Sequence, residues 1–325
     1  MRNIVVVGSL NMDLVVYAAR HPQVGETILG ESFITNPGGK GANQAVAARR
    51  LGAAVTMIGK VGSDAFGSQL LENLQLNGVD VAPVLQDRDA ATGVALITIG
   101  ASGDNSIIVV PGSNMQLSPA DIEQTESVIS KADILISQLE IPIATVLRTA
   151  QIGKAHGARI ILNPAPAQTL PPELLGLVDI LVLNESETEI LSDSPVDSEE
   201  NLLRAAKELK RMIPGDVVVT LGDQGCTWLG QTETFHLPAI PVQAVDTTAA
   251  GDAFIGGLAV AILENRLMAE ALRWGNAAGA FTVTQKGAQS SLPRREQVEE
   301  MLKNYQKGQD LRDSGLKTIN SLRSE

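Results

Sequence analysis

The chain has 325 residues, enough for one large α/β domain or two ordinary domains, and its 44% hydrophobic and 19% charged residues are close to globular averages. Aromatic residues make up only 3%, so Ala, Val, Ile and Leu must fill the interior, as is typical of parallel sheets. The formal net charge of −12 argues against a nucleic-acid surface or an anionic-membrane surface, because both need clustered cationic side chains.

The N-terminus and the cysteine content predict a cytoplasmic protein. The apolar run that starts at Ile4 is too short for the core of a signal peptide, and no stretch reaches the roughly 18 apolar residues of a membrane span. Cys226 is the only cysteine and lies in an apolar, strand-like stretch, so we expect a reduced and packed thiol.

Strand and helix patterns alternate through most of the chain. Blocks rich in Val, Ile and Leu predict strands buried on both faces at 4–7, 55–58, 134–136, 159–162, 180–183 and 217–221. Helical patterns lie between them at 42–51, 65–76, 119–130, 143–156 and 199–212, and the last third adds helices from Gly251, Met268 and Arg294. This alternation predicts an α/β fold with a doubly wound, mostly parallel sheet flanked by helices.

Two pairs of segments interrupt the alternation and predict a small inserted β-sheet. Residues 14–18 with 27–35, and 93–99 with 106–110, alternate like half-exposed strands. We interpret this sheet as a lid that could close over a ligand, and because its edges need covering we expect it to pair with a second copy in a homodimer. Residues 1–305 would form one domain, and the weakly patterned tail 306–325 has no assigned role.

Asn11 and Asp13 follow the first predicted strand, at the edge where open α/β sheets bind ligands. They lie on one side of an extended chain, where an amide and a carboxylate can donate to and accept from adjacent hydroxyls of a polyol. A plain turn is the alternative. The Gly-x-Gly-x-x-Gly pattern of a dinucleotide loop is absent here.

Residues 36–44 form a glycine-rich loop that leads into a helix. The backbone at Gly39 and Gly41 can approach sugar hydroxyls closely, and Asn43 in the first turn points back into the same cleft. The spacing is not that of a Walker A loop. Lys40 could contact a phosphate, although a solvated lysine is the alternative.

Further polar residues follow later strands at the same edge, among them Glu140 and the segment 163–167. Glu187 comes three residues after Asn184 at a helix start, where it could organise Mg²⁺ through water or simply complete a capping box. Residues 220–225 end a strand with a turn whose glycines leave room for a nucleotide base, and a hairpin turn explains them as well.

Residues 246–253 form a loop that opens a buried helix and carries Asp252 at its mouth. Small residues and a helix N-terminus suit an anion, and Asp252 lies where an alcohol could lose its proton, so the segment favours phosphoryl transfer. The alternative is an ordinary helix start capped by Thr248 or Asp252. With a pKa near its reference value of about 4, Asp252 would be a weak base, and positioning would supply most of the acceleration.

In this order, the segments 8–13, 38–44, 163–167, 184–187 and 246–252 resemble those of the ribokinase family of carbohydrate kinases, across about residues 3–305. The resemblance implies ATP-dependent phosphorylation of D-ribose at the 5-hydroxyl, with ribose 5-phosphate and ADP as products. Another sugar or a nucleoside is the alternative acceptor. A non-catalytic sugar-binding regulator is a further alternative from another class.

The resemblance also implies residue roles. Asp252 would be the catalytic base, with the anion hole formed by Ala249, Ala250 and Gly251. Ribose would be held by Asn11, Asp13, Gly39, Lys40, Gly41, Asn43, Glu140 and Asp252. ATP would be contacted by Asn184, Thr220, Leu221, Gly222, Asp223, Gln224, Gly225, Gly251 and Asn276. Glu187 would help place Mg²⁺ through water, and an activating K⁺ would be held, mostly by carbonyls, at Asp246, Thr248, Thr282, Gln285, Gly287 and Ser291.

Overall fold

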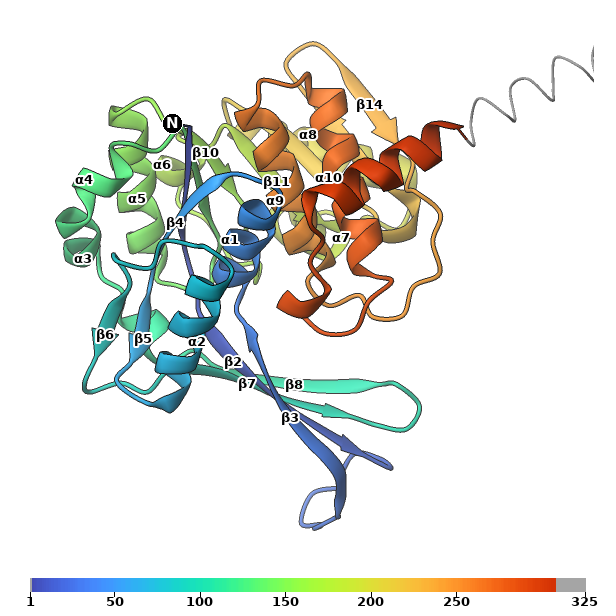
Figure 1. The fold of residues 1–325 in the computed structure, drawn as a ribbon. Helices are drawn as coiled ribbons and strands as arrows, with labels where there is room; N and C mark the ends of the chain where they lie inside the picture. Colours follow the sequence, from blue (N-terminus) through green and yellow to red (C-terminus); the bar gives the residue numbers. More distant parts are fainter. Residues whose placement is uncertain (1, 308–325) are drawn as a thin grey trace, which may run out of the picture.

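The computed structural model describes residues 2–307, and an eight-stranded sheet lies at its centre (Figure 1). The strands β4, β1, β9, β10, β11 and β12 run parallel, and β13 and β14 complete one edge in antiparallel orientation. In spatial order the strands are β14 (Thr234–Leu237), β13 (Cys226–Leu229), β12 (Asp216–Thr220), β11 (Ile180–Asn184), β10 (Arg159–Leu162), β9 (Ile134–Ser137), β1 (Asn3–Val7) and β4 (Ala54–Ile58). The predicted doubly wound, mostly parallel sheet is confirmed.

Two apolar cores lie on opposite faces of this sheet, because successive side chains of a strand point to opposite sides. In β1, Ile4 and Val6 belong to one core, and Val5 and Val7 belong to the other. The first core is covered by α1 (Lys40–Arg50), α2 (Ala65–Leu76), α9 (Ala250–Leu263) and α10 (Met268–Thr282). The second is covered by α3 (Pro119–Gln124), α4 (Glu126–Ile129), α5 (Ile143–Ala155), α6 (Pro172–Leu175), α7 (Glu185–Ser192) and α8 (Glu199–Met212).

Helix α9 is buried on every side and packs directly against α1. Every residue from Asp252 to Leu263 is buried. A Cβ added at Gly256 would lie 2.9 Å from the backbone nitrogen of Ala48 in α1, so only glycine permits this approach. The close packing brings the first turn of α9 beside the first turn of α1.

A separate four-stranded sheet projects from the helix-covered sheet, and we refer to it as the lid (Figure 1). Its strands, in spatial order, are β3 (Gly30–Gly38), β2 (Asn11–Ala18), β7 (Gly93–Ile99) and β8 (Asn105–Val110). The inserted sheet was predicted, but the bounds of β2 and β3 differ from the expected 14–18 and 27–35. Pairing of Asn11 with Gly38 extends the ladder to the body of the protein, so Asn11 and Asp13 lie in β2 and the plain-turn alternative is wrong.

Smaller differences from the sequence prediction occur at element ends. The segment 119–130 forms two helices, because the chain breaks at Thr125, whose hydroxyl donates to the carbonyl of Ile122 (2.9 Å). A short parallel pair, β5 (Lys60–Gly62) and β6 (Leu85–Asp87), was not predicted. The short 3₁₀ helices are η1 (Gly112–Gln116), η2 (Gly222–Gln224) and η3 (Gln289–Ser291).

The last described helix runs from 295 to 307, so the first two residues of the predicted tail continue it. Residues 308–325 of that tail lie outside the described residues. Within residues 2–307, no helix combines the length and the apolar composition that a bilayer span needs.

Candidate active site

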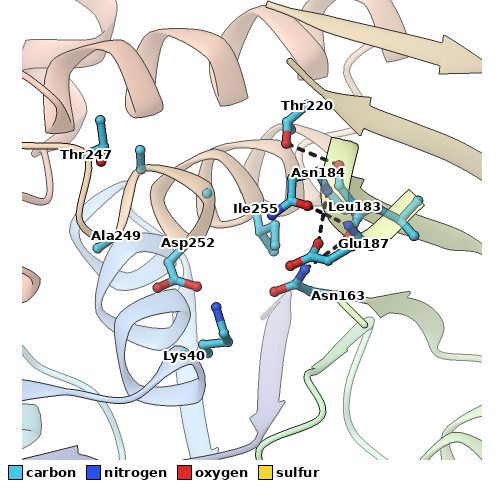
Figure 2. A pocket seen from close by; sticks show the side chains of 13 residues that line it. Lys40, Asn163, Leu183, Asn184, Glu187, Thr220, Thr247, Ala249, Asp252 and Ile255 are labelled. Carbon is cyan, nitrogen blue, oxygen red and sulfur yellow. Dashed lines mark hydrogen bonds between the residues drawn. The ribbon is translucent and has the colours of Figure 1, made fainter. Parts of the chain in front are cut away.

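A cavity of about 210 Å³ lies where β10, β11 and β12 end and where α1, α7 and α9 begin (Figure 2). This is the edge of the sheet at which α/β proteins bind ligands, as the sequence predicted. The cavity is lined by Lys40, Asn163, Val182, Leu183, Asn184, Glu187, Thr220, Thr247, Ala249, Ala250, Gly251, Asp252 and Ile255.

Asp252 lies in the first turn of α9 and is only 8% exposed. Two amides from the first turn of α1 hold its carboxylate: Asn43 Nδ2 donates to Oδ2 and Gln44 Nε2 donates to Oδ1, each at 2.9 Å. Burial raises the pKa of Asp252, against the opposing effects of the Lys40 charge and these two hydrogen bonds. The prediction of a near-reference pKa was therefore wrong, and Asp252 is a stronger base than its sequence context indicated.

The N-terminus of α9 offers unpaired backbone donors to the cavity. Ala249 precedes the helix in the left-handed region (φ 61°), and no side chain caps the helix, so the capping alternative for Thr248 and Asp252 is wrong. The Ala250 N–H donates to the Thr247 carbonyl (3.2 Å). Within the described part of the chain, the N–H groups of Gly251 and Asp252 have no acceptor, so they are available to an anion.

Lys40 projects into the cavity toward Asp252 (Figure 2). Burial lowers the pKa of Lys40, but the negative charges of Asp252, Glu140 and Glu187 outweigh it and raise the pKa. The side chain is half-buried and its raised pKa keeps it charged, so its contact with a phosphate stays a prediction beside the alternative of a solvated lysine.

Glu140 joins several segments near Asp252. Its Oε2 accepts hydrogen bonds from the hydroxyl of Ser9, from the backbone N–H of Lys40 (3.1 Å) and from Asn11 Nδ2 (3.4 Å). The Asn11 side chain is in turn fixed by Asn114, whose Nδ2 donates to Asn11 Oδ1 (2.7 Å). The first turn of α1, the start of β2 and the loops after β1 and β9 thus meet at one carboxylate.

Asp13 adds a further carboxylate to this side. Its carboxyl group lies so close to Gly38 that a Cβ at Gly38 would overlap it. Burial raises the pKa of Asp13 to about 7, and the negative charges of Glu140 and Asp252 contribute to the rise. Three acidic side chains gathered around one space provide acceptors for several adjacent hydroxyl groups.

Glu187 and Asn184 form a capping box and also line the cavity. Asn184 Oδ1 accepts from the Glu187 N–H (2.8 Å), and Glu187 Oε2 accepts from the Asn184 N–H (2.9 Å). One carboxylate oxygen of Glu187 remains outside this box. Burial raises the pKa of Glu187. The capping alternative is therefore confirmed, and it does not exclude a role for Glu187 in the cavity.

Of the residues expected to contact ATP, the cavity collects Asn184, Thr220 and Gly251. Thr220 ends β12, and its hydroxyl donates to the Leu183 carbonyl (3.1 Å). The turn between β12 and β13 is a hairpin turn, as the alternative held. Asn276 donates to the Pro238 carbonyl (3.2 Å). The residues of this set outside the cavity lining are Leu221, Gly222, Asp223, Gln224, Gly225 and Asn276.

The segments expected to hold K⁺ lie side by side, and Asp246 connects them. Its carboxylate accepts from the N–H of Thr248 (2.9 Å) and of Gly287 (2.8 Å). Burial alone would raise the pKa of Asp246, but these hydrogen bonds prevail and lower it, so the carboxylate stays ionised. The hydroxyls of Thr282 and Ser291 donate to the carbonyls of Ala278 and Ala288 (2.9 and 2.6 Å), and Gln285 Nε2 donates to the Thr284 hydroxyl (3.1 Å). Within residues 2–307, no cluster of three or more His, Cys, Asp and Glu side chains could hold a metal.

Several residues of the site had no role assigned from the sequence. Gln44 contacts Asp252, Asn114 orients Asn11, and Gln138 contacts Gln44 (2.6 Å). All three are completely buried. The only signal in the sequence was an amide side chain inside or beside an apolar segment, which is also typical of an ordinary helix or strand end.

Comparisons with known proteins give matches over most of the chain. The profile of the pfkB family of carbohydrate kinases matches residues 1–295. The chain is 41% identical over 301 residues to the ribokinase of Haemophilus influenzae, covering 93% of this chain and 98% of that protein. It is 39% identical over 301 residues to the deoxyribokinase of Salmonella typhi, covering 92% and 98%. A structure of Arabidopsis thaliana ribokinase with ribose and ATP is similar at a TM-score of 0.88 and 36% identity, covering 93% and 99%.

Proposed function

This chain belongs to the pfkB family of carbohydrate kinases, and we propose that it transfers the γ-phosphoryl group of ATP to the 5-hydroxyl of D-ribose, giving ribose 5-phosphate and ADP. The position of Asp252 carries this proposal. The buried carboxylate is near enough to Glu140 and Asp13, the proposed polyol-binding side chains, for their charges to affect its pKa or be affected by it, and it lies in the first turn of α9, whose N–H groups are open.

The chemistry divides among the residues of the site. Asp252 accepts the proton of the 5-hydroxyl as its oxygen attacks the γ-phosphorus. The N–H groups of Gly251 and Asp252 and the Lys40 ammonium stabilise the charge on the migrating phosphoryl group. Ribose is oriented by Asn11, Asp13, Gly39, Gly41, Asn43 and Glu140, and the nucleotide by Asn184, Thr220 and the residues that follow it, together with Asn276.

Mg²⁺ and K⁺ are the proposed ions. The free oxygen of Glu187 faces the cavity and would hold Mg²⁺ through water, and the ion, when bound with ATP, neutralises phosphate charge. The ionised Asp246 and the neighbouring carbonyls of 282–291 provide the oxygen-rich surroundings that suit K⁺. Cytoplasmic location is part of the same proposal, because ATP is a substrate. A reduced thiol at Cys226 is consistent with it, since burial raises the pKa of this thiol to about 12 and keeps the thiol unreactive.

One experiment tests the acceptor. ADP release is measured with Mg-ATP and either ribose, 2-deoxyribose, fructose or adenosine, with and without K⁺. The highest kcat/KM is expected with ribose, and K⁺ should increase it. Deoxyribose is the second candidate because one relative is a deoxyribokinase. A preference for adenosine would contradict the proposal, and ribose binding without ADP release would instead favour a sugar-binding regulator.

Alanine substitutions at two glycines of the site are expected to separate folding from catalysis. A Cβ at Gly41 would lie 2.6 Å from the backbone nitrogen of Ser9, so Gly41→Ala should destabilise the protein by at least about 1–3 kcal/mol. No atom lies within 4 Å of a Cβ at Gly251, so Gly251→Ala should unfold at the wild-type temperature but lower kcat about 10-fold, because its methyl group enters the anion site. Thermal unfolding and kcat of both variants check this, and equal unfolding temperatures for both would contradict it.

Ribose binding is expected to release a proton near pH 7 and just below it. The pKa of Asp13 is about 7 in the sugar-free protein, and hydroxyl donors favour the ionised carboxylate, so binding lowers this pKa and ribose affinity falls as the pH drops below 7. Because the pKa is raised in the folded state, the same group also lowers the free energy of unfolding as the pH rises toward 7.

Calorimetry of ribose binding in two buffers of different ionisation enthalpy measures the released protons. Asp13→Asn should abolish the release, because an amide does not titrate. Proton uptake by the wild-type protein on binding would show that the sign is wrong.

We propose that the lid sheet forms a homodimer. Every residue of β8 is exposed, and the apolar side chains of Phe33, Leu96 and Ile108 are 59%, 44% and 64% exposed, respectively. Such a patch is unusual on a monomer. Sedimentation of the wild-type protein should show a dimer, and Ile108→Lys should weaken it at least about 10-fold. Ile190→Lys, at a 60% exposed position in α7, is the matched control; a wild-type monomer at micromolar concentration would refute the proposal.

A further inference from the structure

Three buried amide side chains contact one another beside Asp252. Gln44 and Gln138 are 0% exposed and Asn163 is 7% exposed. They come from α1, from the residue after β9 and from the residue after β10. We call them the amide chain.

Gln44 uses its whole amide group within this chain. Its Nε2 donates to Asp252 Oδ1 (2.9 Å) and to Asn163 Oδ1 (3.2 Å), and its Oε1 accepts from Gln138 Nε2 (2.6 Å). Both hydrogens and the oxygen are thus engaged. A rotation of Gln44 would leave a carboxylate oxygen and two amides unpaired in the interior, which is strongly unfavourable.

Two groups that bond to the amide chain fix the orientation of Gln44 and Asn163, whereas Gln138 Oε1 at the other end is buried without a partner among residues 2–307. Both carboxyl oxygens of Asp252 accept hydrogen bonds from amide nitrogens, those of Asn43 and Gln44, and the carbonyl of Val182 can only accept. Asn163 Nδ2 therefore donates to the Val182 carbonyl (3.0 Å), which turns Asn163 Oδ1 toward Gln44. Gln44 must then present its nitrogen to Asp252 and its oxygen to Gln138.

The backbone leaves room for this arrangement at Gly8. A Cβ at Gly8 would overlap the Gln138 side-chain oxygen and would lie 3.0 Å from the Cα of Gly41. A glycine at this position thus allows Gln138 to reach Gln44. The first motif of the chain therefore serves the catalytic carboxylate as well as the sugar.

Asn43 and Gln44 donate to different oxygens of Asp252, but they differ in how many of their own side-chain atoms already have hydrogen-bond partners. Asn43 Oδ1 is buried and has no hydrogen-bond partner among residues 2–307. Asn43 also belongs to the loop proposed to contact ribose, so it can exchange partners when a sugar binds. Gln44 has no unused group, so it keeps its position.

We propose that Gln44 is a positioning residue, held by Gln138 and Asn163, that fixes the orientation of the Asp252 carboxylate for proton removal. This inference rests on the proposed function, because it takes Asp252 as the base. A hydrogen bond to the ionised form also favours that form, so Gln44 keeps Asp252 deprotonated at lower pH than burial alone would allow.

The test is the pH profile of kcat for Gln44→Met, which keeps the length of the side chain and removes its hydrogen bonds. At neutral pH kcat should fall roughly 10-fold or more, because one hydrogen bond to a charged group is lost. The acid limb of the profile should move to higher pH, while the KM values for ribose and ATP change less than about 2-fold. Gln138→Met should lower kcat and move the acid limb in the same directions but by less, since it only frees Gln44 to rotate. This variant replaces Gln44→Met in the test if Gln44→Met does not fold.

Thr149→Val is the matched control. Thr149 is 1% exposed and donates to the Thr145 carbonyl inside α5 (2.9 Å), so its loss removes a buried hydrogen bond without touching Asp252. Its profile should match the wild type. An unchanged acid limb in both amide variants, or an equal loss of kcat at every pH, would overturn the positioning role. Absence of ADP release by the wild-type protein would instead overturn the proposed function.

Discussion

Asp252→Asn is expected to lower kcat for ribose phosphorylation by roughly 10²–10⁴-fold, the usual worth of general-base catalysis. Asparagine has the same shape but cannot accept the proton of the 5-hydroxyl. The loss should appear in kcat, because we propose that ribose is held mainly by other side chains, such as Glu140 and Asp13. The KM values for ribose and ATP should change far less than kcat.

Steady-state ADP release and calorimetric binding of ribose measure these quantities. Asp216→Asn is the matched control, because burial also raises the pKa of Asp216, yet this residue starts β12 at the opposite edge of the sheet. The control should keep wild-type kcat. If Asp252→Asn retained kcat within a few-fold of wild type, Asp252 would not be the base.

Lys40→Met is expected to lower kcat roughly 10²–10³-fold. The ammonium of Lys40 is the cationic side chain among the residues that line the cavity, and the charges of Asp252, Glu140 and Glu187 keep it protonated. In the proposed transition state it would stabilise the charge spread over the phosphoryl oxygens. Its loss also removes a charge that lowers the pKa of Asp252, so the acid limb of the kcat profile should move to higher pH.

The measurement is kcat against pH for Lys40→Met and for Lys60→Met. Lys60 is a suitable control because it is also partly buried and pairs with Asp121 (2.8 Å). It lies in β5, outside the cavity. Lys60→Met should lose stability and keep its kcat. A change confined to the KM for ribose in Lys40→Met would assign Lys40 to ground-state sugar binding instead.

The central layers of the fold were predictable because they follow from local patterns. Ile4 to Val7 form one apolar run without alternation, and this indicated a strand buried on both faces. The helices 65–76 and 199–212 were predicted with the observed bounds. Strand ends were less predictable, because the pairing of Asn11 with Gly38 depends on the approach of two segments rather than on either alone.

The members of the site were largely predictable as well, since each follows a strand or opens a helix at the same edge of the sheet. Lys40 was identified in a glycine-rich loop and Asp252 in a loop of small residues, and both line the observed cavity. Gln44, Asn114 and Gln138 were not assigned a role. An amide has no distinctive sequence signature, and its importance depends on the partner that packing brings to it.

Local patterns in the amino-acid sequence were enough to predict the alternation of strands and helices and a carboxylate at the start of a late helix. The basicity and the hydrogen-bond partners of that carboxylate depend instead on how distant segments pack. Gln44 and Asp252 are 208 positions apart and meet because α9 packs against α1. Their contact, the raised pKa of Asp252 and the charged state of Lys40 all arise from burial and from charges on distant segments, since desolvation and Coulomb interactions depend on distance in space and not along the chain.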